Sequence, residues 1–236
     1  MRLFVSIAVW ARNMEWLGVC LASLRAQTCI DWRAVVSIDE GTAIDQRWAE
    51  RATHDDARVK VVTAARRRYT LSNTLANLAS ARGGDVVVIL DGDDQFARAD
   101  ALDLVHAAHE RGAWVTYGSY VANRRGYPQL LGPIESAAHG EWRASHLRTF
   151  RRALLRHIPD ERLRDADGEL YRAACDVALM VPCLQLAGEH VEHIPEPLVL
   201  YNRHPQAVAD LDGGRQRRAY ERITSFPVLQ PLVSLS

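Results

Sequence analysis

An almost wholly apolar run at 85–90 (DVVVIL) constrains the fold of this chain more than any other feature of the sequence. A strand of this composition is covered on both faces, as strands are at the centre of a parallel sheet. The run continues directly into Asp91, Gly92, Asp93 and Asp94. The sequence therefore predicts a buried central strand that ends in an acidic turn.

Apolar runs of strand length alternate with segments of helical periodicity through the first half of the chain. We predict strands at 5–9, 32–38, 58–62, 85–90 and 113–117, and helices at 14–27, 44–53, 71–81 and 100–111. This alternation predicts an α/β fold with an open, mostly parallel sheet and helices on both faces. Such sheets bind ligands beyond the carboxyl ends of their strands, where both Asp39 and Asp91 fall.

The second half of the chain is less regular. Its segments are a loop region rich in Gly and Pro at 124–139, helices at 145–156 and 169–187, a strand interrupted by prolines at 191–201, and a basic helix with a Pro-containing tail within 206–236. Neither a repeat nor a linker is visible, so we expect one domain over 1–236, with 1–120 and 121–205 on the two sides of a cleft.

Composition narrows the class of protein. Lys+Arg and Asp+Glu both number 29, so the formal charge is zero, and this balance does not favour nucleic acid or an anionic membrane as the main partner. Four cysteines without a CxxC pair indicate reduced, buried thiols. The apolar run at 3–11 is interpreted as a buried strand, and no run approaches the ~18 residues of a membrane span. We expect a cytoplasmic protein, free or peripherally bound at a membrane.

The acidic turn calls for a compensating cation. Three carboxylates within four residues at the end of a buried strand repel one another. Mg²⁺ or Mn²⁺ is the natural partner, because hard cations prefer oxygen ligands and keep positions free for substrate phosphates. Gly92 would allow a ligand or the backbone to approach closely. The alternative is a polar turn or helix cap without an ion.

Several motifs resemble, in order and spacing, those of glycosyltransferase family 2, the inverting glycosyltransferases of GT-A fold. VVVILDGDD (86–94) resembles the DxD strand end of that family, SIDEG (37–41) its acidic turn after the second strand, and PEPLVLYNRH (195–204) its closing strand. The segments 150–163 and 174–188 are similar to the region that ends in the Glu-Asp helix of the family. The resemblance extends from about residue 5 to residue 204.

The resemblance implies a GT-A fold, Rossmann-like and specific for nucleotide-diphospho sugars. It implies an enzyme that transfers a sugar from such a donor, most often a UDP-sugar, to an acceptor hydroxyl with the help of Mn²⁺ or Mg²⁺. A saccharide or glycolipid acceptor is the usual case in the family, and the clusters of arginines at 66–68 and 215–218 would also tolerate a modified base in DNA.

The resemblance also implies residue roles on the donor side. Asp39 would contact the nucleobase, Asp91 would lie near the ribose or the metal, and Asn73 corresponds to the Asn before the central strand. Arg68, from the basic cluster, is our candidate for the diphosphate.

The metal and the acceptor side take three further residues from the resemblance. Asp93 would be the main metal ligand, supported by Asp94, and His204 would lie near the metal or the diphosphate. Asp176 would be the general base that deprotonates the acceptor hydroxyl.

The sequence departs from the family pattern beside this base, where Cys175 replaces the usual acidic residue. Three upstream residues could serve as the base instead: Asp165, Asp167 and Glu169. Farther upstream, Trp142 could stack on a sugar or close a core, and His146 could cap a helix. Two other functions stay open: an aspartyl-nucleophile phosphatase of the haloacid dehalogenase kind, whose first strand also ends in DxD, and a relative that binds nucleotide sugars without transferring them.

Overall fold

The computed structural model describes residues 1–122, 128–129, 144–202 and 213–235. Within them one sheet contains nine strands: β1 (Leu3–Trp10), β2 (Trp32–Asp39), β3 (Val59–Ala64), β4 (Val86–Asp91), β5 (Gln95–Phe96), β6 (Val115–Ala122), β7 (Pro128–Gln129), β8 (Arg148–Arg151) and β9 (Val191–Tyr201). The strand order is β3-β2-β1-β4-β8-β6-β9-β5, and β7 pairs with β6.

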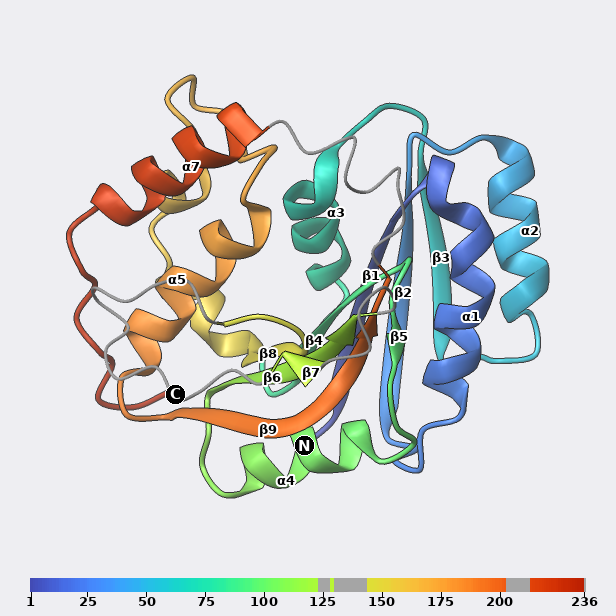
Figure 1. Ribbon diagram of the computed structural model, residues 1–236, viewed down its shortest axis with the longest axis horizontal. Coiled ribbons are helices and arrows are strands. Elements are labelled where there is room, and N and C mark those ends of the chain that lie inside the picture. The colour runs from blue at the N-terminus through green and yellow to red at the C-terminus, as the bar shows by residue number, and fades with distance from the viewer. Residues whose placement is uncertain (123–127, 130–143, 203–212, 236) are drawn as a thin grey trace.

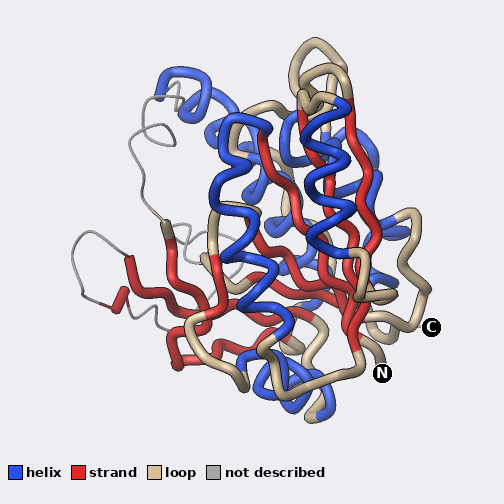
Figure 2. The backbone as a smooth tube through the Cα atoms, turned by 90° about the vertical axis from the view of Figure 1, so that its right-hand side faces the viewer, coloured by secondary structure: helices blue, strands red, loops and turns tan. Residues whose placement is uncertain are grey.

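Helices flank this sheet on both faces (Figures 1 and 2). The α-helices are α1 (Met14–Arg25), α2 (Ala43–Thr53), α3 (Tyr69–Leu78), α4 (Ala101–Glu110), α5 (Cys175–Ala187) and α7 (Gly213–Ser225), and the 3-10 helices are η1 (Ala11–Asn13), η2 (Arg152–His157) and η3 (Asp160–Leu163). In the described ranges, no helix has the length and apolar character needed to span a membrane.

The first four long strands form the regular part of the sheet. β3, β2, β1 and β4 are all parallel, with Val5 opposite Val88 in the centre. In β4, Val86 and Val88 pack in the core with α1 and α4, whereas Val87 and Ile89 pack in the opposite core with α3 and α5. Because a strand alternates its side chains between faces, a strand buried on both sides must be apolar throughout. The predicted central strand is confirmed.

The second half of the sheet is antiparallel where it meets the first. β8 lies between β4 and β6 and is antiparallel to both, with Phe150 opposite Val87. β9 then runs parallel to β6, with irregular register between Tyr117 and Tyr120. By the extent of its pairing, the mixed sheet is still mostly parallel, as predicted.

The predicted helix at 145–156 is wrong. Residues 148–151 form β8, and the 3-10 helix η2 follows. Local periodicity did not reveal this strand, because the free edge of β4 supplies the backbone partners that decide its conformation. The predicted helix at 169–187 is right only from Cys175, since Ala174 takes a left-handed conformation (φ 48°) that α-helical residues do not adopt.

Candidate active site

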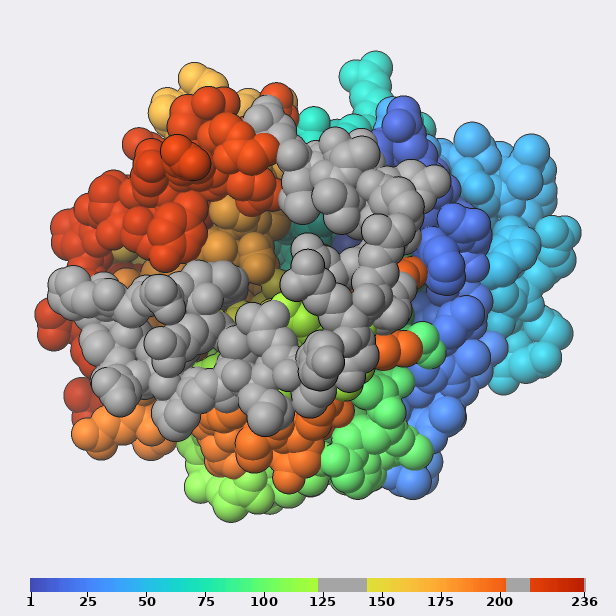
Figure 3. All heavy atoms as spheres, in the orientation of Figure 1, coloured from blue at the N-terminus to red at the C-terminus, as the bar shows by residue number. Residues whose placement is uncertain are grey.

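A cavity of about 390 Å³ opens where β1, β2 and β4 end. On the face of the molecule shown in Figure 3, α7 lies on one side of the molecule, and α1 and α2 lie on the opposite side. Polar and charged side chains from both halves of the chain line the cavity: Asn13, Asp39, Arg67, Asn73, Asp91, Asp93, His146, Arg148, Arg172, Asp176, Asn202 and Arg215. This is the edge at which an open α/β sheet binds ligands.

Asp39 is buried at the end of β2 and lines this cavity. Its carboxylate accepts the backbone N–H groups of Arg68 (2.6 Å) and Tyr69 (3.0 Å), which lie at the start of α3. Arg67 Nε lies 3.4 Å from the same carboxylate. Asp39 thus anchors the basic loop and compensates the unpaired N–H groups at the start of that helix.

The basic loop contributes Arg67 to the cavity, whereas Arg68 is not among the lining residues. The Arg67 guanidinium lies 3.4 Å from the centre of the Trp10 ring, and Trp10 Nε1 donates to Glu40 Oε2 (2.9 Å). Tyr69 presents its ring 5.0 Å from the same guanidinium. A stacked cation and two aromatic rings form a flat wall that suits a planar group such as a nucleobase.

The acidic turn after β4 is tightly packed against β1. Gly92 N–H donates to the carbonyl oxygen of Ala8 (2.9 Å), and a Cβ at Gly92 would lie 2.5 Å from Val9 Cβ. Glycine is therefore required here for the close approach of two backbones. The turn aims Asp93 at the cavity, where its carboxylate accepts Asn13 Nδ2 (3.1 Å).

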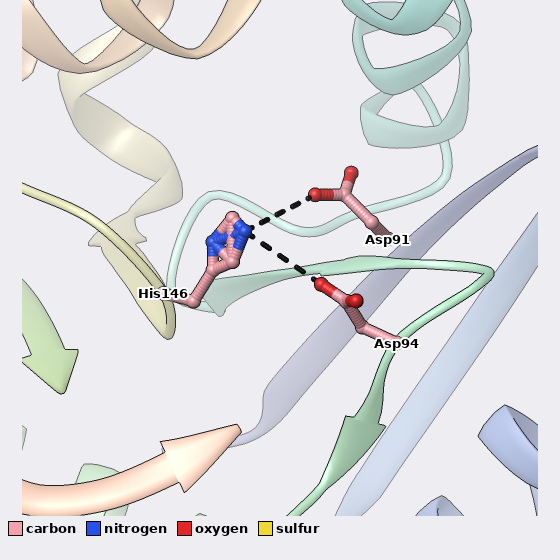
Figure 4. Close-up of side chains that lie close together, drawn as sticks. All are labelled: Asp91, Asp94 and His146. Carbon is pink, nitrogen blue, oxygen red and sulfur yellow. Dashed lines mark ion pairs between the residues drawn. The ribbon is translucent and has the colours of Figure 1, made fainter. Parts of the chain in front are cut away.

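Asp91, Asp94 and His146 converge beside this turn (Figure 4). His146 Nε2 lies 3.7 Å from Asp91 Oδ2 and 3.6 Å from Asp94 Oδ2. Within the described residues, Asp94 Oδ2 and both ring nitrogens of His146 are buried without a hydrogen-bond partner. Buried polar atoms of this kind normally have a partner, so the arrangement fits a bound cation.

The electrostatics of Asp94 and His146 agree with that fit. Burial, followed by the charges of Asp91 and Asp93, raises the pKa of the Asp94 carboxyl well above its ordinary value. Burial, followed by the charge of Arg148, lowers the pKa of His146 well below its ordinary value. Neutral imidazole and carboxylate oxygens are ligands for divalent metals, and a metal ion would relieve the repulsion that raises the pKa of Asp94.

The metal ligands proposed from the sequence only partly coincide with this group. Asp91 belongs to it, and Asp93 lies next to it on the cavity wall. His204 lies outside the described residues. The helix-cap role suggested for His146 is wrong, because no helix begins there. Its signal was its place just before β8, which pairs with the DxD strand β4, but this pairing is long-range.

The sequence pattern assigns no separate role to Arg148, which falls in the segment predicted as a helix. It lies at the start of β8, opposite Ile89 of β4, and its side chain is only 5% exposed. Nη2 donates to Asp91 Oδ2 and Nη1 donates to Asp176 Oδ2, both at 3.0 Å. One guanidinium thus joins the acidic turn of the first half of the chain to the first turn of α5 in the second half.

Asp176 enters the cavity from the first turn of α5. The preceding turn is held by Gln216 of α7, whose Oε1 accepts the backbone N–H of Ala174 (2.6 Å). Cys175 Sγ donates to the carbonyl oxygen of Tyr171, and burial raises the pKa of this thiol to about 12. Cys175 is therefore a neutral group at neutral pH and does not replace the missing acid.

The three alternative bases lie in a different place. Asp165 accepts the backbone N–H groups of Asp167 and Glu169 in a turn, and none of the three is among the residues that line the cavity. Asn73, by contrast, does line it, and its buried Nδ2 has no hydrogen-bond partner in the described part of the chain. Trp142 lies outside the described residues.

Comparison with known proteins agrees with this geometry. The fold, with its cavity at the strand ends, is that of an α/β protein of GT-A type. The sequence model described as "Glycosyl transferase family 2" matches residues 6–161, which is well over half of the chain. This chain therefore belongs to glycosyltransferase family 2. A search of curated proteins finds no match.

Solved structures of S. aureus TarS share the fold. The complex of TarS residues 1–349 with UDP-GlcNAc superposes with a TM-score of 0.69 at 18% identity, over 94% of this chain and 65% of that one. The longer TarS structure gives a TM-score of 0.68 at 19% identity, over 96% and 44%. The TarS 1–349 structure without a named ligand gives a TM-score of 0.62 at 19% identity. This chain spans 60% of the length of that structure.

Proposed function

We propose that this protein is a metal-dependent inverting glycosyltransferase that moves a sugar from a UDP-sugar to an acceptor hydroxyl on a saccharide or glycolipid. Membership of the family supports transfer from a nucleotide sugar. The structurally similar S. aureus TarS has been solved with UDP and with UDP-GlcNAc, which supports a uridine nucleotide as the donor. A modified DNA base is a less favoured acceptor, because the formal charge of the chain is zero.

One observation carries the proposal: carboxylates from opposite halves of the chain face the same cavity. Asp91 and Asp93 border it on the side of the strand ends, and Asp176 borders it from α5. Inverting transfer needs this division, with a base on the acceptor side and charge compensation at the leaving diphosphate on the other. A covalent intermediate is not required, so a single carboxylate in the acceptor half is enough.

Asp176 is the proposed base. Its side chain is 37% exposed, and its Oδ2 is engaged by Arg148. The other oxygen of Asp176, Oδ1, would take the proton of the acceptor hydroxyl. The hydroxyl oxygen would then attack the anomeric carbon as the bond to the nucleotide diphosphate breaks.

The chain would bind the donor along the opposite wall. The Trp10–Arg67 stack would support the uracil ring, and Asn73 Nδ2 would donate a hydrogen bond to the UDP-sugar. Asp39 would act here mainly through the loop that it anchors. Arg68 remains a candidate for the diphosphate, with its backbone N–H on Asp39.

A divalent cation, Mn²⁺ or Mg²⁺, would supply positive charge to the leaving diphosphate when bound. Asp91, Asp94 and His146 would hold it, with Asp93 on the adjoining wall and His204 as a further candidate ligand.

Turnover of a panel of nucleotide sugars by the purified protein tests the proposal. We expect slow hydrolysis of one UDP-sugar that requires Mn²⁺ or Mg²⁺ and is abolished by EDTA. Calorimetry with the same panel gives the binding of each donor independently of turnover. Absence of heat and of turnover with every donor would contradict the proposal.

Two outcomes separate the other functions. Donor binding with neither hydrolysis nor transfer to any saccharide or lipid acceptor would favour a relative that binds nucleotide sugars without transferring them. Release of phosphate from simple phosphoesters would favour the phosphatase. The pairing of Asp91 with Arg148 speaks against the phosphatase, since a phosphatase of that kind needs this carboxylate free as its nucleophile.

A further inference from the structure

We propose that Arg148 is a positioning residue that holds the base Asp176 in register with the acidic turn, so that one buried guanidinium aligns the acceptor side with the donor side. The proposal rests on the proposed function and deepens it, because it assigns the alignment of the two half-sites to a single residue.

The geometry of Arg148 suits such a bridge. Its guanidinium is planar and offers parallel donors, and two of its nitrogens contact two carboxylates from different halves of the chain at 3.0 Å each. Lysine has a single ammonium, which cannot hold two separate carboxylates in one fixed geometry.

The strand that carries Arg148 is rigidly held. Thr149, the next residue, points to the opposite face of the sheet, and its Oγ1 contacts His109 Nε2 (2.7 Å) and Thr116 Oγ1 (2.6 Å). β8 also pairs with strands on both of its sides. The sheet, through Arg148, therefore fixes the position of the Asp176 carboxylate more than the loop before α5 does.

Gln216 holds the backbone of the segment before Asp176, but not the Asp176 side chain. Ala174 is left-handed, Cys175 turns its thiol away to Tyr171, and the helix start has no side-chain cap. Among the hydrogen bonds of the described residues, the contact with Arg148 is the one made by the Asp176 carboxylate.

A double-mutant cycle tests whether Arg148 acts through Asp176. We expect Arg148→Met to lower kcat for transfer about 100-fold, since misplacement of a reacting group by about 1 Å costs that much. KM for the donor should change far less. In the Asp176→Asn background, Arg148→Met should cost little more, because the group that it orients is already inactive.

Additional variants separate positioning from folding. Arg148→Lys should lose nearly as much kcat as Arg148→Met, because it keeps the charge but cannot make the bridge. Arg162→Met is the matched control, since Arg162 is also buried but donates to the Pro227 carbonyl oxygen, outside the cavity. It should keep its kcat. Fully additive losses in the cycle, or a kcat close to that of the wild type in the Lys variant, would overturn the proposal.

A crystal structure of the Arg148→Met variant provides a test that needs no activity. We expect α5 to keep its fold and the Asp176 carboxylate to leave its position beside β8. An unmoved Asp176 would overturn the positioning role. Failure of the proposed function would show differently, as absence of donor binding and turnover in the wild-type protein.

Discussion

The two halves of this molecule build the same cavity by different means. In the first half, Asp39 and Asp91 end parallel strands at one sheet edge, as strand order and alternation dictate. In the second half, His146, Arg148 and Asp176 reach the cavity from an antiparallel strand and from a helix that follows a left-handed residue. In the proposed function, the regular scaffold would thus supply the donor side, and the irregular chain would supply the acceptor side.

The difference matters because the two sides have different tasks. A carboxylate turn at a strand end is a general platform for a charged diphosphate. The acceptor side would have to place one proton acceptor accurately, and we propose that the long-range contact of Arg148 provides that accuracy. Apart from His146, which shares the candidate metal group, changes in the second half should therefore act mostly on turnover, and changes in the first half mostly on binding.

The largest effect is expected from Asp176→Asn. It should lower transfer about 10³-fold while leaving donor affinity measured by calorimetry nearly unchanged, because general-base catalysis typically contributes 10²–10⁴-fold. Asp167→Asn, in the exposed turn away from the cavity, is the control and should be fully active. Normal turnover in Asp176→Asn would break the division between the halves.

The next effect concerns stability where the halves join. Burial lowers the pKa of His109 from 6.5 to about 4, and the neutral ring bonds to the Ala113 carbonyl oxygen and to Thr149 of β8. Between these pH values the unfolded state binds a proton that the folded state does not. The free energy of unfolding should fall by about 3 kcal/mol as pH drops from 6.5 to 4.

Urea titrations between pH 4 and 7 check this linkage. His109→Gln should reduce the slope of stability against pH in that window. His106→Gln, on the same helix but partly exposed, is the control and should keep the slope of the wild type. An unchanged slope in His109→Gln would assign the pH dependence to other groups.

A smaller effect is expected for metal binding across the halves. His146→Ala should weaken Mn²⁺ binding by about tenfold in calorimetry with the metal alone, since it removes one ligand and leaves two carboxylates. His157→Ala, on the exposed end of η2, should bind Mn²⁺ normally. Unchanged affinity in His146→Ala would mean that the first half of the chain holds the ion by itself.

The smallest effect is expected for Cys175→Ser. The thiol is neutral and donates to Tyr171, and a serine hydroxyl can make the same bond. Turnover should stay within about twofold, and stability should change by less than about 1 kcal/mol. Loss of turnover would show that this departure from the family pattern has a chemical role.

Much of the first half could be predicted. The apolar run at 85–90 identified the central strand, and its acidic end identified the edge where the cavity opens. The family and the fold class are confirmed, whereas the roles of Asp39, Asn73, Arg68, Asp93 and Asp176 stay predictions. His146 and Arg148 escaped because they looked like part of a helix, and only pairing with β4 makes their segment a strand.

The amino-acid sequence by itself determined the alternation of strands and helices, the doubly buried β4 and the acidic turn, because these depend on local periodicity and on the chemistry of neighbouring residues. Only the tertiary structure decided that the Arg148 guanidinium pairs with Asp91 and that His146 Nε2 faces Asp94. Arg148 and Asp91 are 57 residues apart, which is too far for any local sequence pattern to relate them. Their contact exists because β8 pairs with the edge of β4.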